Sequence, residues 1–87
     1  MAETEIHGRC DARFARVREA FEENFRARDE IGAALAIAVE GELAVDLWAG
    51  HLDASLSRPW QRDTLVNVYS TTKGVTALAA HRLVARR

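Results

Sequence analysis

The first clear hydrophobic pattern in the chain has the period of an α-helix. Five apolar side chains recur at intervals of four, three, four and four positions: Cys10, Phe14, Val17, Phe21 and Phe25. This spacing places them on one face of a helix, with most charged residues on the other faces. The pattern predicts a helix over residues 11–28 that packs its phenylalanine face against another element. Residues 1–9 show no such pattern, and we expect them to be a loose leader.

The next pattern has the period of a β-strand. Residues 33–39 form a short apolar run in which alanine alternates with Leu35, Ile37 and Val39. The alanine-only face suits close approach by a helix. Glu40-Gly41 has the composition of a tight turn, and residues 42–49 alternate again. We therefore predict a β-hairpin over residues 33–49, in which Leu43, Val45 and Leu47 share one face.

The last third of the chain predicts a loop, a short extended run and a second helix. Glycine, proline and serine are spread through residues 50–64, and residues 65–69 read as extended. A helix starting at Ser70 or Thr71 is apolar around most of its circumference, which is typical of a helix buried in a larger protein. No glycine, asparagine or proline stops it. We expect residues 1–87 to be the N-terminal, incomplete part of one domain.

Composition narrows the function classes. The 87 residues carry a net charge of −1, with arginines and acids interleaved, so nothing predicts a nucleic-acid or membrane-surface partner. The single cysteine gives no intrachain disulfide. No stretch approaches the roughly 20 apolar residues of a membrane span, and the N-terminus has no apolar core of a signal peptide. These features predict a cytoplasmic protein.

One pair of residues has the spacing of a catalytic site. Lys73 is the only lysine among 12 basic residues, and Ser70, one of three serines, stands three positions before it. Residues three apart on a helix are neighbours on one face, so Ser70 Oγ and Lys73 Nζ can approach each other.

The chemistry of this pair suits acyl transfer. A serine hydroxyl needs a base, and a deprotonated lysine can be that base whereas arginine cannot. Both the helix N-terminus and apolar burial disfavour a charged lysine there. We therefore predict Ser70 as nucleophile and Lys73 as general base. The alternative is that Ser70 is a simple N-cap, although a capping box would have Glu or Gln where Lys73 stands.

Other candidate groups fit chemistry less well. His51 follows a predicted strand in a polar loop, and His81 lies three turns along the predicted helix from Ser70, about 16 Å away, so we do not predict a Ser-His-Asp triad. His7, Cys10 and Asp11 lack the spacing and ligand number of a zinc site, so we predict neither a metal nor a cofactor. Trp48 and Trp60 could line an acyl pocket, but aromatic packing is the simpler interpretation.

A longer segment carries a family resemblance. Ser70-Thr71-Thr72-Lys73-Gly74, with residues 63–69 before it and residues 75–78 after it, resembles the nucleophile region of the family VIII carboxylesterases. These belong to the serine β-lactamase and penicillin-binding protein superfamily, near the class C β-lactamases. The first helix, the hairpin with residues 45–50, and Arg58-Pro59-Trp60 resemble the start of such esterases. The resemblance covers residues 10–87.

This resemblance implies a fold, a reaction and further motifs. The fold is the serine β-lactamase-like α/β (α+β) architecture, to which this chain contributes the N-terminal helix, the hairpin and the nucleophile helix. Ser70 would be the acylated nucleophile, its backbone N–H an oxyanion donor, and Lys73 its base. Substrates would be short-chain carboxylic esters, with β-lactams as a secondary class. The family's tyrosine-containing motif and its Lys-Thr-Gly motif are absent from this sequence, so the chain alone is expected to be inactive.

Two other functions remain open on the sequence alone. A D-alanyl-D-alanine peptidase would use the same serine and lysine. Such an enzyme acts outside the membrane, so the lack of a signal-peptide pattern in this sequence counts against it. A non-catalytic α+β interaction module would use the apolar helix and the alanine face as a partner surface.

Overall fold

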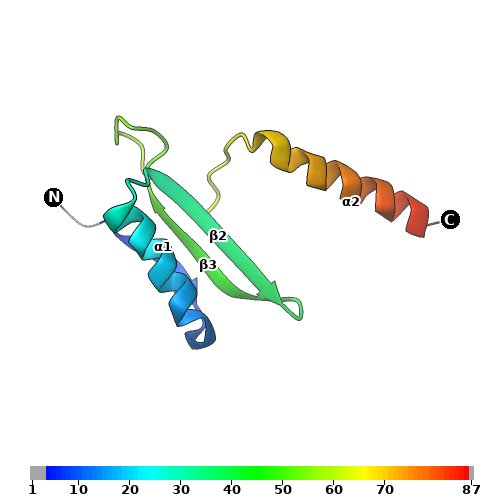
Figure 1. Cartoon of the computed structure of the whole chain (residues 1–87), viewed down its shortest axis with the longest axis horizontal. Helices are drawn as coiled ribbons and strands as arrows, with labels where there is room; N and C mark the ends of the chain where they lie inside the picture. Colours follow the sequence, from blue (N-terminus) through cyan, green and yellow to red (C-terminus); the bar gives the residue numbers. More distant parts are fainter. Residues whose placement is uncertain (1–3, 87) are drawn as a thin grey trace.

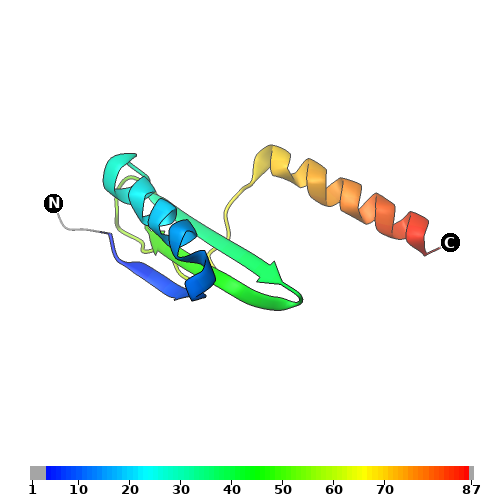
Figure 2. The same ribbon diagram turned by 60° about the horizontal axis from the view of Figure 1, so that its bottom comes forward.

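The computed structural model describes residues 4–86. Its elements in chain order are β1 (Ile6–Cys10), the 3₁₀-helix η1 (Ala12–Phe14), α1 (Ala15–Ala27), β2 (Gly32–Val39), β3 (Glu42–Gly50), the 3₁₀-helix η2 (Tyr69–Thr71) and α2 (Thr72–Ala85). The strands form an antiparallel sheet in the order β1-β3-β2. Helix α1 covers one face of this sheet, and α2 extends away from it (Figures 1 and 2).

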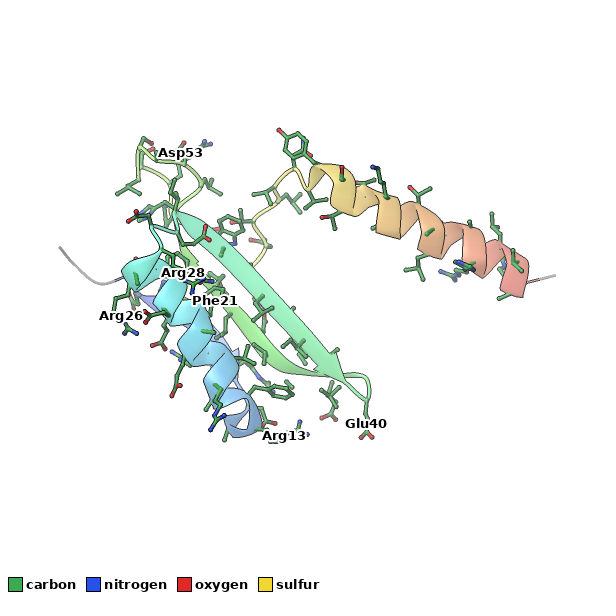
Figure 3. The ribbon with its side chains drawn as sticks, in the orientation of Figure 1. Arg13, Phe21, Arg26, Arg28, Glu40 and Asp53 are labelled. Atoms are coloured by element: carbon green, nitrogen blue, oxygen red, sulfur yellow. The ribbon has the colours of Figure 1, made fainter. Side chains whose placement is uncertain are left out.

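The core lies between α1 and the sheet, as the helical pattern predicts. Val45 and Leu47 of the central strand β3 are 0% and 1% exposed, and Phe21 of α1 is 7% exposed. Phe14 and Phe25 pack against the same cluster. Figure 3 shows Phe21 on the side of α1 that faces the sheet. The phenylalanine stripe of the sequence is therefore the surface that joins helix to sheet.

The hairpin is confirmed, and its turn is tight. Glu40 and Gly41 connect β2 to β3 with φ angles of 51° and 83°. Two successive positive φ angles match the right-handed twist of the flanking strands. Glu40 marks the far tip of the hairpin in Figure 3.

A β-bulge changes the predicted faces of β3. Ile37 pairs with Val45, but Ala38 pairs with Leu43, so Ala44 is an extra residue on β3. The carbonyl of Ala44 accepts a hydrogen bond from the Asp11 N–H at 2.7 Å, beside the end of β1. The prediction that Leu43 shares a face with Val45 is therefore wrong. The bulge moves Leu43 to the alanine side, where it is 40% exposed.

The prediction of a loose leader over residues 1–9 is also wrong for the described residues from Ile6 onward. They form β1, which pairs with β3 and ends at Cys10, so Cys10 belongs to a strand and not to the first helix. Ile6 and Cys10 pack against the core, with Gly8 between them. Because Gly8 has no side chain, it hides the alternation of this strand in the sequence. A Cβ on Gly8 would lie 1.9 Å from the Asp46 carbonyl oxygen, which explains the glycine.

Two apolar surfaces are uncovered within residues 4–86. Ala34, Ala36 and Ala38 are exposed, because α1 packs on the opposite face of the sheet. Residues 72–85 of α2 are exposed along the whole helix. None of the helices in the described part of the chain is long and apolar enough to cross a membrane.

The bulge generates a test with an internal control. We predict that Leu47→Ala lowers the free energy of unfolding by about 2–5 kcal/mol, because it leaves a cavity under α1. In the 87-residue chain, whose alanine side is uncovered, Leu43→Ala removes the same atoms from a side chain that is 40% exposed, and its cost should be about 0.5 kcal/mol or less. Urea unfolding followed by circular dichroism measures both. Equal losses would contradict the described register.

Candidate active site

The predicted nucleophile and base lie where the chain enters α2. Ser70 is the middle residue of η2, and Lys73 is in the first turn of α2. Both line an open hollow of about 430 Å³, together with Tyr69, Thr72 and Thr76. The structure therefore brings the two residues to one surface, as their spacing predicts.

The Ser70 hydroxyl does not cap a helix. Thr71 is the N-cap of α2 and Val68 that of η2, and neither cap has a side-chain hydrogen bond. The structure therefore contradicts the alternative in which Ser70 is a simple N-cap. Within residues 4–86 the Ser70 hydroxyl has no hydrogen-bond partner.

Lys73 is exposed, and it lies in an open position. It forms no ion pair with any of the carboxylates between residues 4 and 86. The burial expected around this lysine is not provided by the described residues, since all of α2 is exposed. Lys73 nevertheless lies in the first turn of α2, close to the positive end of the helix dipole. Hydrogen bonds between nucleophile and base are often long before substrate binds, so the open geometry is compatible with catalysis.

The backbone just before Ser70 is strained. The prediction that residues 65–69 are extended is wrong at its end: Val68 has φ −106° and ψ 5°, and Tyr69 has φ 46°. The left-handed conformation of Tyr69 costs roughly 1–2 kcal/mol for a residue other than glycine. The chain adopts it because it must turn sharply from the loop into α2. Such strain is concentrated at functional sites, where it fixes a side chain in an unusual direction.

Asn67 is a residue of this site that the sequence analysis missed. Its Oδ1 atom accepts a hydrogen bond from the Tyr69 N–H at 2.9 Å. The Thr71 N–H donates to the Val68 carbonyl at 3.0 Å, which closes the next turn. An asparagine two residues before a turn position is a known signal for this local bond, and it could have been recognised.

The other candidate residues lie apart from Ser70. Trp48 and Trp60 line a second hollow of about 520 Å³ with His7, Gln61, Arg62 and Asp63. The His7 ring stacks on Trp48 with centroids 6.2 Å apart, so aromatic packing accounts for part of this surface. An acyl-pocket role for the tryptophans stays a prediction.

Histidines and acids in the described part of the chain are spread out. His51 forms an isolated β-bridge with Pro59, and His81 lies exposed on α2. Between residues 4 and 86, no group of three or more His, Cys, Asp and Glu side chains could hold a metal ion together.

Comparison with known proteins gives this geometry a context. The family model described as "Beta-lactamase" matches residues 17–87. The esterase/beta-lactamase LipL of Mycobacterium tuberculosis is 42% identical over 81 residues, which cover 93% of this chain and 19% of LipL. The esterase EstB of Burkholderia gladioli is 39% identical over 72 residues, which cover 83% of this chain and 18% of EstB.

A solved structure agrees with both fold and sequence. The crystal structure of a family VIII carboxylesterase matches 87% of this chain with a TM-score of 0.83 and 53% sequence identity. The match covers 21% of that carboxylesterase chain. The chain described here thus spans about a fifth of the length of the relatives it matches.

Proposed function

Because the chain belongs to the beta-lactamase family, we propose that it carries the nucleophile segment of a serine hydrolase that cleaves short-chain carboxylic esters. The observation that carries this proposal is the shared hollow of Ser70 and Lys73 at the start of α2. Relatives described as esterases support the ester class. Weak β-lactam hydrolysis is a secondary activity, since it uses the same acyl-serine chemistry.

The proposed reaction has two halves. Ser70 Oγ attacks the ester carbonyl carbon while its proton passes to Lys73 Nζ. The tetrahedral intermediate then expels the alcohol, which takes a proton from the lysine ammonium, and leaves an acyl-serine. Water hydrolyses this acyl-enzyme to the carboxylic acid and free Ser70. The Ser70 N–H, at the helix N-terminus, donates to the oxyanion in both halves.

The proposed domain is larger than this chain. Val75, Leu78, Leu83 and Val84 on α2 are 57–70% exposed, and the alanine face of β2 is exposed as well. Apolar surface of this extent is normally covered by protein. The match to the family VIII carboxylesterase covers 21% of that longer chain. We take residues 4–86 as the N-terminal part of one β-lactamase-like domain, whose remainder covers both surfaces and completes the site.

The identity of the nucleophile is tested by Ser70→Ala. In the protein as its native gene encodes it, this change should lower the hydrolysis of p-nitrophenyl butyrate by at least about a thousandfold, because no other hydroxyl takes the acyl group. Ser57→Ala is the matched control: Ser57 lies in the loop, where its hydroxyl is paired with that of Ser55 at 2.8 Å. Its activity should be unchanged. Full activity of Ser70→Ala would contradict the assignment.

The role of Lys73 is tested by Lys73→Arg. Arginine keeps the positive charge but cannot accept the serine proton, so the rate of ester hydrolysis should fall by about 10²–10⁴-fold. Arg82→Ala removes a cation from the same helix and should leave the rate unchanged. Activity of Lys73→Arg equal to that of the unsubstituted protein would show that the lysine is not the base.

The size of the domain is tested by the intact mass of the protein purified from its native source. We predict a mass several times the 9.7 kDa of this chain. A native protein of 9.7 kDa would contradict the larger domain, and it would favour the interaction module over the enzyme.

A further inference from the structure

The turn before Ser70 is held by polar bonds and not by packing. Val68 is 49% exposed and Tyr69 is 79% exposed, so no core contact within residues 4–86 fixes this segment. Tyr69 nevertheless has a φ of 46°, a conformation that a residue with a side chain rarely adopts unless its surroundings impose it. Within residues 4–86, the contacts that can stabilise this turn are therefore local hydrogen bonds.

The carboxamide of Asn67 is the group that does so. Its Oδ1 atom lies 2.9 Å from the Tyr69 nitrogen and accepts the N–H of the strained residue. An asparagine side chain that bonds the backbone two residues later replaces a backbone turn bond and fixes the direction of the chain. Because Asn67 Oδ1 accepts the Tyr69 N–H, the N–H of the next residue, Ser70, does not take part in this hydrogen bond.

The next bond of the segment lies directly beyond Ser70. The Thr71 N–H donates to the Val68 carbonyl at 3.0 Å. Ser70 is thus bracketed by the Asn67–Tyr69 bond on one side and the Val68–Thr71 bond on the other. Of these two bonds, only the first depends on a side chain, so only it can be removed by substitution.

From this geometry we propose that Asn67 is a positioning residue, which holds Tyr69 in its left-handed conformation and thereby aims the Ser70 hydroxyl and N–H at the substrate carbonyl. This role rests on the proposed function of Ser70. Asn67 does not touch the reacting atoms and acts through the backbone of Tyr69. Small misplacement of a nucleophile has a large effect on rate and a small effect on substrate binding.

The experiment compares Asn67→Ala with Asn67→Asp in the protein as its native gene encodes it. Alanine removes the acceptor, whereas aspartate keeps an oxygen at the same position. We expect Asn67→Ala to lower kcat for p-nitrophenyl butyrate by about 10–100-fold with little change in KM. Asn67→Asp should restore most of the rate. Crystal structures of the two variants should show Tyr69 with a negative φ in the first and a positive φ in the second.

Thr64→Ala is the matched control. Thr64 Oγ1 accepts the Gln61 N–H at 2.8 Å, so this variant also loses a loop bond between a side chain and the backbone, six residues before Ser70. Its kcat should be unchanged.

Two outcomes separate this inference from the proposed function. If Ser70→Ala abolishes hydrolysis and Asn67→Ala keeps both the native kcat and the positive φ of Tyr69, the positioning role is overturned and the nucleophile stands. If Ser70→Ala retains activity, the proposed function fails. The φ of Tyr69 in the Asn67→Ala crystal then still decides whether Asn67 holds the turn.

Discussion

The burial of one face of β3 beneath α1 is the interaction on which the rest of this structure depends. Val45 and Leu47 lose almost all contact with solvent when the phenylalanine stripe of α1 packs over them. Burying two such side chains contributes about 3–6 kcal/mol, which is large for a three-stranded sheet. β1 and β2 pair with β3 on either side of it, and residues of both strands pack against the same core cluster. The loop that leaves β3 starts from this sheet and leads to α2 (Figure 1).

The second constraint is the transition from this loop into α2. The chain passes from the loop into α2 through the three residues of η2. Tyr69, the first of these residues, takes the unfavourable left-handed conformation. Ser70 follows the strained residue in η2, directly before α2. In the proposed reaction, the helix dipole and the backbone N–H groups at this end of α2 would face the substrate carbonyl. The proposed nucleophile therefore lies in a segment, residues 67–71, that is held by two local hydrogen bonds, from the Tyr69 N–H to Asn67 and from the Thr71 N–H to Val68.

Periodicity was sufficient to predict α1 and the hairpin, since Phe21 and Leu47 follow the simple periods of helix and strand. It failed where one residue breaks a period. Gly8 conceals β1, and the extra Ala44 moves Leu43 to the other face, because a bulge depends on pairing with another strand and not on local sequence. The Ser70–Lys73 pair was predicted from the three-residue spacing between a serine and the only lysine, together with the family resemblance, and the structure places both residues at one hollow. Asn67 was missed because asparagine signals this local bond only where a turn is expected, and residues 65–69 were expected to be extended.

The central claim is that Ser70 is the residue that becomes acylated. The most direct measurement is tandem mass spectrometry of the native protein after reaction with a serine-directed fluorophosphonate. Trypsin cleaves after Arg62 and Lys73, so Ser70 lies in the peptide 63–73 beside three threonines and Tyr69. The account predicts one phosphonyl group per molecule, with fragment ions that place it on Ser70. An adduct on any other residue, with an unmodified 63–73 peptide, would contradict it.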